Sequence, residues 1–84
     1  MNRNDCKLLY MLYKEECFDA FQAITATKLS QICELSGTKV RKTLNEFVSE
    51  GYVGEGYKKS QARTFYVTNS GIECLKTMMP ADSF

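Results

Sequence analysis

The segment ICELSGTKVRKTLNEFVSEGYV, residues 32–53, decides the fold. Ser36 and Gly37 interrupt one helical pattern, and Ser36 predicts the N-cap of the next helix because its hydroxyl can accept a free N–H of the first turn. Apolar residues then follow one another at spacings of four, three and one residues, which places them on one face of an α-helix. They are Val40, Leu44, Phe47 and Val48. Gly51 predicts the end of this helix, which spans 36–50, since glycine readily adopts a positive φ.

Two helical patterns precede this segment. The first covers 5–17, where Asp5 can act as the cap. The second covers 26–35, with Thr25 as its expected N-cap and Thr27 as the alternative. The sequence therefore predicts three helices in the first 50 residues.

The region after Gly51 predicts a β-hairpin. Residues 64–68 are all β-branched or aromatic, which favours a strand, and residues 52–57 predict its partner, although two glycines weaken that partner. The connection, 58–63, is longer than a tight turn needs. Ile24-Thr25 can add a very short strand.

A short last helix follows the hairpin. Thr68 or Ser70 can cap it, and Ser70 with Glu73 fits a capping box. Pro80 predicts its end, which leaves 80–84 as a tail.

Composition excludes several classes of protein. The 84 residues fit one domain, 1–84, and the absence of histidine leaves no Cys–His or Ser–His pair, so we expect no enzyme. The four cysteines lie 11, 16 and 41 residues apart, whereas zinc sites usually use close Cys or His pairs, so we expect no metal and no cofactor. No apolar run approaches the ~20 residues that span a bilayer, and the polar N-terminus is unlike a signal peptide. These features predict a cytoplasmic protein without a membrane partner, whose thiols are reduced and mostly buried.

Basic side chains concentrate in the middle third of the chain. Residues 36–63 carry six bases and three acids, a net charge of +3, whereas 1–35 and 64–84 each carry −1. A basic region indicates a polyanionic partner, although a charged run is more often a solvated surface. The bases lie on the polar side of the helix over 36–50 and in the connection 58–63, which contains no acid.

Two helices joined by a short turn containing glycine form the helix-turn-helix arrangement, in which the first helix braces the second. The pattern here is Leu29-x-x-Ile32-x-x-Leu35-Ser36-x-x-x-Val40-x-x-x-Leu44-x-x-Phe47-x-x-x-Gly51-Tyr52-Val53, then Arg63-Thr64-Phe65-Tyr66-Val67-Thr68-x-x-Gly71. It resembles the winged helix-turn-helix domains of small bacterial and phage regulators, broadly the multiple-antibiotic-resistance regulator type.

The resemblance implies an α+β fold with a three-helix core, a two- or three-stranded β-wing and a short C-terminal helix. It also implies a transcriptional regulator that binds double-stranded DNA, with the helix over 36–50 in the major groove and the wing, 57–64, on phosphate or in the minor groove. The DNA-binding residues that it implies are Ser36, Gly37, Thr38, Lys39, Arg41, Lys42, Asn45, Lys58, Lys59 and Arg63. The chain lacks the long extra helices through which larger members dimerise and bind ligands.

The first helix carries an apolar stripe broader than a one-sided surface helix needs. Its members are Leu8, Leu9, Met11, Leu12 and Tyr13. The stripe packs centrally in the core, or it pairs with a second copy, which predicts a homodimer through this helix. Two other functions stay open, because fold alone does not determine function. One is a protein-interaction module, and the other is an RNA-binding or phage or plasmid replication accessory.

Overall fold

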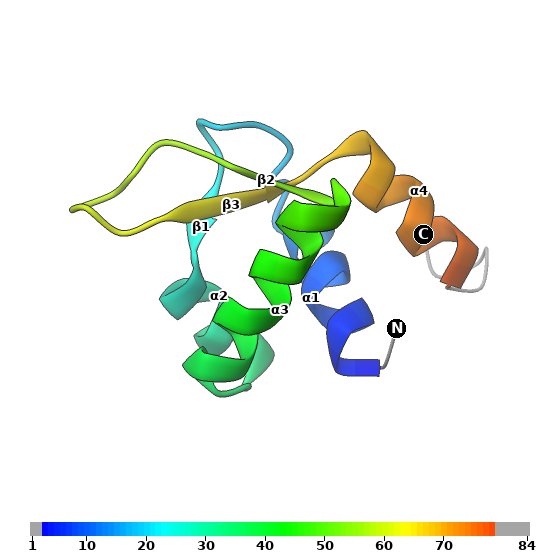
Figure 1. The fold of residues 1–84 in the computed structure, drawn as a ribbon, viewed down its shortest axis with the longest axis horizontal. Coiled ribbons are helices and arrows are strands. Elements are labelled where there is room, and N and C mark those ends of the chain that lie inside the picture. The colour runs from blue at the N-terminus through cyan, green and yellow to red at the C-terminus, as the bar shows by residue number, and fades with distance from the viewer. Residues whose placement is uncertain (1–2, 79–84) are drawn as a thin grey trace.

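The computed structural model describes residues 3–78 and contains four helices and three strands (Figure 1). In chain order they are α1 (Arg3–Lys14), β1 (Ile24–Thr25), α2 (Ala26–Cys33), α3 (Gly37–Glu50), β2 (Val53–Glu55), β3 (Thr64–Val67) and α4 (Asn69–Met78). The strands form one antiparallel sheet in the order β1-β3-β2. This is the predicted α+β winged helix-turn-helix fold, and its wing has three strands. Among residues 3–78, none of the helices combines the length and apolar character that crossing a membrane requires.

The apolar stripe of α1 lies inside the domain's own core. Leu8, Leu9 and Leu12 have no exposed surface, and Met11 and Tyr13 pack half-buried against the same core. The breadth of the stripe follows from its neighbours, since α1 packs against α2, α4 and β3. The interpretation that the stripe packs centrally in the core is thus confirmed. Its leucines have no exposed surface against which a second copy could pack.

Both ends of α3 follow the local signals in the sequence. Ser36 is the N-cap, and its hydroxyl accepts a hydrogen bond from the Lys39 N–H at 3.2 Å. At the other end Gly51 adopts a φ of +83°, and the Tyr52 N–H returns to the Phe47 carbonyl at 2.9 Å. The Gly51 N–H also donates to the Val48 carbonyl at 3.1 Å. Together the two hydrogen bonds form a Schellman motif, which glycine favours because a Cβ is strained at positive φ.

The predicted ends of α1 and α2, at 17 and 35, were wrong. Each helix ends earlier, at Lys14 and Cys33, because Glu16 and Glu34 both adopt a left-handed φ of 58°. After α1 the Cys17 N–H then turns back to a carbonyl of the last helical turn, at 3.0 Å. Glutamate seldom takes this conformation, so the sequence carried no signal for either stop.

The predicted caps have mixed outcomes. Thr25 caps α2 by accepting the Lys28 N–H at 3.1 Å, so the Thr27 alternative was wrong. Asp5 lies inside the first turn of α1 and is not its cap.

Thr68 caps α4 by accepting the Gly71 N–H at 3.1 Å. Ser70 is a helical residue, so the capping-box alternative was wrong. The expected helix stop at Pro80 and the tail 80–84 lie outside the described residues.

The tip of the wing is a tighter turn than the long loop that the sequence predicted. Lys59 and Ala62 exchange two backbone hydrogen bonds, of 3.0 and 2.8 Å, around Ser60 and Gln61. Both central residues have positive φ, 48° and 67°, as in a two-residue type I′ turn. The hairpin therefore continues beyond β2 and β3 to a tight tip.

Two of the four thiols belong to the core. Cys17 and Cys33 are buried, whereas Cys6 and Cys74 are half-buried. Burial raises the pKa of the Cys17 and Cys33 thiols above the ordinary value, because a thiolate is poorly solvated there. The Glu15 charge also raises the pKa of Cys17, while Lys59 lowers the pKa of Cys17 and Lys7 that of Cys33 by smaller amounts.

We expect Gly51→Ala to destabilise the domain by about 1–2 kcal/mol, because alanine is strained at positive φ. Urea unfolding measures the change, and Ser49→Ala, at an exposed helical site, is the control that should stay within about 0.5 kcal/mol of wild type. Glu34→Gly should shift stability the opposite way, since glycine relieves the same strain. Equal stability of Gly51→Ala and wild type would contradict this account of the turn.

The buried thiols predict a loss of stability in alkali. A raised folded-state pKa means that the folded chain keeps protons which the unfolded chain releases, so unfolding becomes easier as pH rises above the free thiol pKa of about 8.5. Urea unfolding between about pH 7.5 and 9.5 tests this. In the double variant Cys17→Ala/Cys33→Ala, the free energy of unfolding should decline less steeply with pH than in wild type. An identical slope in the two proteins would argue against buried neutral thiols.

Candidate nucleic-acid interface

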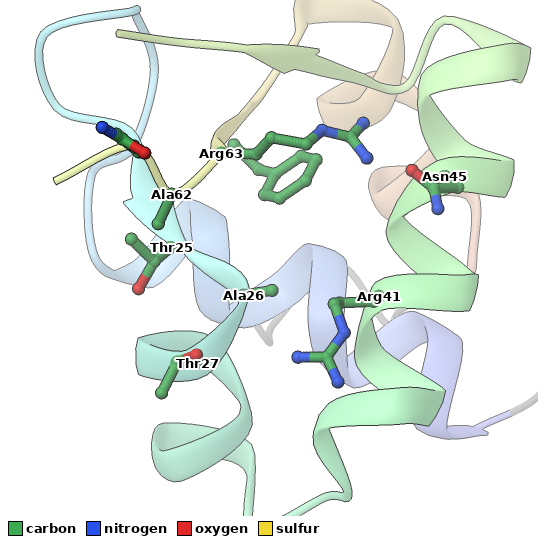
Figure 2. A pocket seen from close by; sticks show the side chains of 9 residues that line it. Thr25, Ala26, Thr27, Arg41, Asn45, Ala62 and Arg63 are labelled. Atoms are coloured by element: carbon green, nitrogen blue, oxygen red, sulfur yellow. The ribbon is translucent and has the colours of Figure 1, made fainter. Parts of the chain in front are cut away.

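A groove of about 340 Å³ separates α3 from the wing (Figure 2). Three parts of the chain line it: the end of β1 with the start of α2, the polar side of α3, and the returning arm of the wing. Its lining residues are Thr25, Ala26, Thr27, Arg41, Asn45, Gln61, Ala62, Arg63 and Phe65. Because β1 pairs with β3, the start of α2 lies beside the wing.

Arg41 and Asn45 project from α3 into this groove (Figure 2). They lie four residues apart, so they occupy the same side of the helix, one turn after the other. Both are exposed, whereas their neighbours Val40 and Leu44 anchor the buried side of α3 with no exposed surface. Gly37 leaves room for the arginine, since a Cβ at that position would lie 3.3 Å from Arg41 Nη1.

Arg63 faces α3 from the wing. Its guanidinium forms an ion pair with Glu55 on β2 and lies over the Phe65 ring, 5.1 Å from the ring centroid. The side chains of the ion pair are each somewhat less than half exposed. The contacts hold the arginine head in place at the rim of the groove, while Glu55 offsets part of its charge.

The structure brings only three of the ten predicted DNA-binding residues into the groove, namely Arg41, Asn45 and Arg63. Thr38 and Lys42 are exposed elsewhere on α3, and Lys39 is half-buried. Ser36 uses its hydroxyl as a cap. Lys58 and Lys59 are exposed on the wing.

Sequence reasoning missed three polar residues of the groove, Thr25, Thr27 and Gln61. Thr25 and Thr27 were considered only as helix caps, and Gln61 only as an uncharged part of a loop. Nothing in their local sequence marks them, because they reach the groove through tertiary packing: α2 packs on α3, and β1 pairs with β3. Within residues 3–78, no three Cys, Asp or Glu side chains gather to hold a metal ion.

No protein-family model matches the chain. The solved DNA-binding TubR fragment from Clostridium botulinum aligns with a TM-score of 0.75, 40% identity, and coverage of 94% of this chain and 98% of the fragment. TubR from Bacillus megaterium pBM400 aligns with a TM-score of 0.80 at 23% identity, over 93% of this chain and 86% of that one.

A more distant likeness shows the fold alone. MepR, a transcription regulator from Staphylococcus aureus, aligns with a TM-score of 0.76 at 14% identity, over 92% of this chain and 54% of MepR.

Among curated proteins, the DNA-binding protein TubR of Clostridium botulinum C phage is 40% identical over 79 residues, which are 94% of this chain and 98% of the relative. At this identity and coverage, the chain belongs to the TubR family of DNA-binding proteins.

Proposed function

We propose that this chain is a non-enzymatic, cytoplasmic regulator of transcription that binds double-stranded DNA. The observation that carries the proposal is the groove, which gathers Arg41 and Asn45 of α3 with Arg63 of the wing (Figure 2). A major groove about 12 Å wide admits one helix, and α3 is the helix with an exposed polar side next to a wing. The two TubR relatives at 40% identity are DNA-binding proteins, and MepR, which shares the fold, is a transcription regulator.

The polar side of α3 has the chemistry to read bases. An arginine can donate two hydrogen bonds to guanine, and an asparagine can bond adenine through both its amide atoms. Arg41 and Asn45 supply these groups on consecutive turns, and their exposure leaves the donors available. Lys42 and Thr38 flank them and suit phosphate or base contacts.

The wing suits the phosphate backbone. Lys58 and Lys59 are exposed and no acid lies between Tyr57 and Arg63 in the sequence, so this arm presents positive charge. The tight turn at Ser60 and Gln61 holds the arm in a defined shape. Such contacts position a protein on DNA without reading its sequence.

A homodimer is part of this proposal, because one domain of this size offers few phosphate contacts. The leucines of α1 that first suggested a dimer are buried, so the contact requires another surface.

Arg41→Ala and Asn45→Ala should each relax sequence preference by about 1–3 kcal/mol, the contribution of a good bidentate base contact. A duplex selected from a random pool, compared with a scrambled duplex in fluorescence anisotropy, gives the measurement. Gln31→Ala, on the exposed side of α2 outside the groove, is the matched control and should behave as wild type. If both α3 variants keep wild-type preference, base reading by this side of α3 is wrong.

Removing the positive charges of the wing should lower the affinity for all DNA duplexes by a similar factor. Each lost phosphate contact flattens the slope of log affinity against log salt by about 0.9, so Lys58→Ala/Lys59→Ala/Arg63→Ala should flatten it by about two to three. Arg63→Ala alone should contribute the least, because Glu55 already offsets its charge. A salt series on one selected and one random duplex tests this, and an unchanged slope would show that the wing does not touch DNA.

A further inference from the structure

One of the cations at the groove is held by an acid of the same wing. The guanidinium of Arg63 donates from Nη2 to Oε1 of Glu55 on β2. Glu55 lies opposite Phe65 in the β2–β3 register, and Arg63 precedes Phe65 by two residues, so the three side chains share one face of the hairpin. Arg63 and Phe65 line the groove beside α3 (Figure 2). The acid is thus placed to control a cation that faces DNA in the proposed function.

The ion pair has little effect on the stability of the fold and a larger effect on the guanidinium itself. Both of its side chains are nearly half exposed, and exposed ion pairs contribute little to folding. An arginine presents several N–H donors in a planar fork, and Glu55 binds one end of that fork. The Phe65 ring supports the face of the guanidinium, 5.1 Å from centroid to Cζ. The other donors of the fork are left at the rim of the groove in a fixed orientation.

The two lysines of the same wing differ from Arg63 in this respect. In the described part of the chain no acid pairs with Lys58 or Lys59, and both are exposed. A cation that neutralises a phosphate strengthens binding to every duplex, because counterion release does not depend on sequence. Lys58 and Lys59 can do so directly, whereas Arg63 must first leave Glu55. The pair therefore withholds one charge from the sequence-independent part of DNA binding.

We propose that Glu55 is a positioning residue that raises the sequence specificity of DNA binding by holding Arg63. On a duplex that fits the groove, Arg63 stays paired with Glu55 and its other donors bind the DNA. On an unmatched duplex, the same pairing keeps the guanidinium from neutralising a phosphate. Specificity is a difference between two affinities, so an element that weakens the wrong complex increases it. This inference rests on the proposed function and adds an acid to a site whose other polar members are neutral or basic.

Glu55→Gln tests the proposal, because it removes the charge and keeps an amide oxygen that can accept from Arg63. Affinity for a random duplex should rise roughly two- to fivefold, the range that an exposed ion pair supplies. The slope of log affinity against log salt on that duplex should steepen by about 0.9, as for one added phosphate contact. Affinity for the selected duplex should rise less, so that the ratio of the two affinities falls.

Glu73→Gln is the matched control, because it removes the same charge from an exposed site on α4, at the opposite end of the molecule from the wing tip (Figure 1). It should leave the affinity ratio and the salt slope as in wild type. Thermal melts of Glu55→Gln and wild type should coincide closely, since the ion pair is exposed.

The Arg63→Ala chain separates positioning from direct repulsion of DNA by the carboxylate. If Glu55 acts through Arg63, adding Glu55→Gln to Arg63→Ala should change neither the affinity ratio nor the salt slope. The same change in both backgrounds would overturn the proposal, and so would an affinity ratio that Glu55→Gln leaves at the wild-type value. If wild type bound neither duplex, the proposed function itself would fail, so the two failures are distinguishable.

Discussion

The left-handed turn at Gly51 fixes the orientation of α3 relative to the wing. The Tyr52 N–H bonds the Phe47 carbonyl to close the helix, and the Tyr52 carbonyl accepts the Thr68 N–H at the end of β3. The Thr68 hydroxyl also donates to the Gly51 carbonyl at 2.6 Å. One small backbone junction thereby ties together the end of α3, the start of β2 and the start of α4. The groove depends on it, because α3 and the wing leave this junction in different directions (Figure 1).

Local signals in the sequence were sufficient for much of the fold. Ser36 and Gly51 mark the ends of α3 because a hydroxyl cap and a positive φ are properties of single residues. The same reasoning found Thr25, Thr68 and the short β1 strand. It failed at the ends of α1 and α2, where Glu16 and Glu34 adopt a positive φ that glutamate seldom takes. It failed again at the wing tip, where a type I′ turn forms without its usual Asn-Gly.

The candidate site was predictable only in part, because it is made by tertiary contacts. Periodicity placed Arg41 and Asn45 on the exposed side of α3, where they remain. Periodicity alone could not show that Thr27 and Gln61 line the same groove, since that depends on how α2 and the wing pack around α3. The apolar stripe of α1 left two interpretations open for the same reason: its breadth reflects three neighbours inside the domain, which the helix sequence alone does not reveal.

A titration with a duplex selected from a random pool, followed by amide chemical shifts, tests the central claim most directly. If α3 and the wing bind DNA around the groove, the duplex should change the amide chemical shifts of three regions together: Thr38 to Asn45, the start of α2 and the wing tip. The amide chemical shifts of α1 and α4 should not change. Chemical-shift changes confined to α1, α4 or the connector between α1 and β1, with α3 unchanged, would contradict the account.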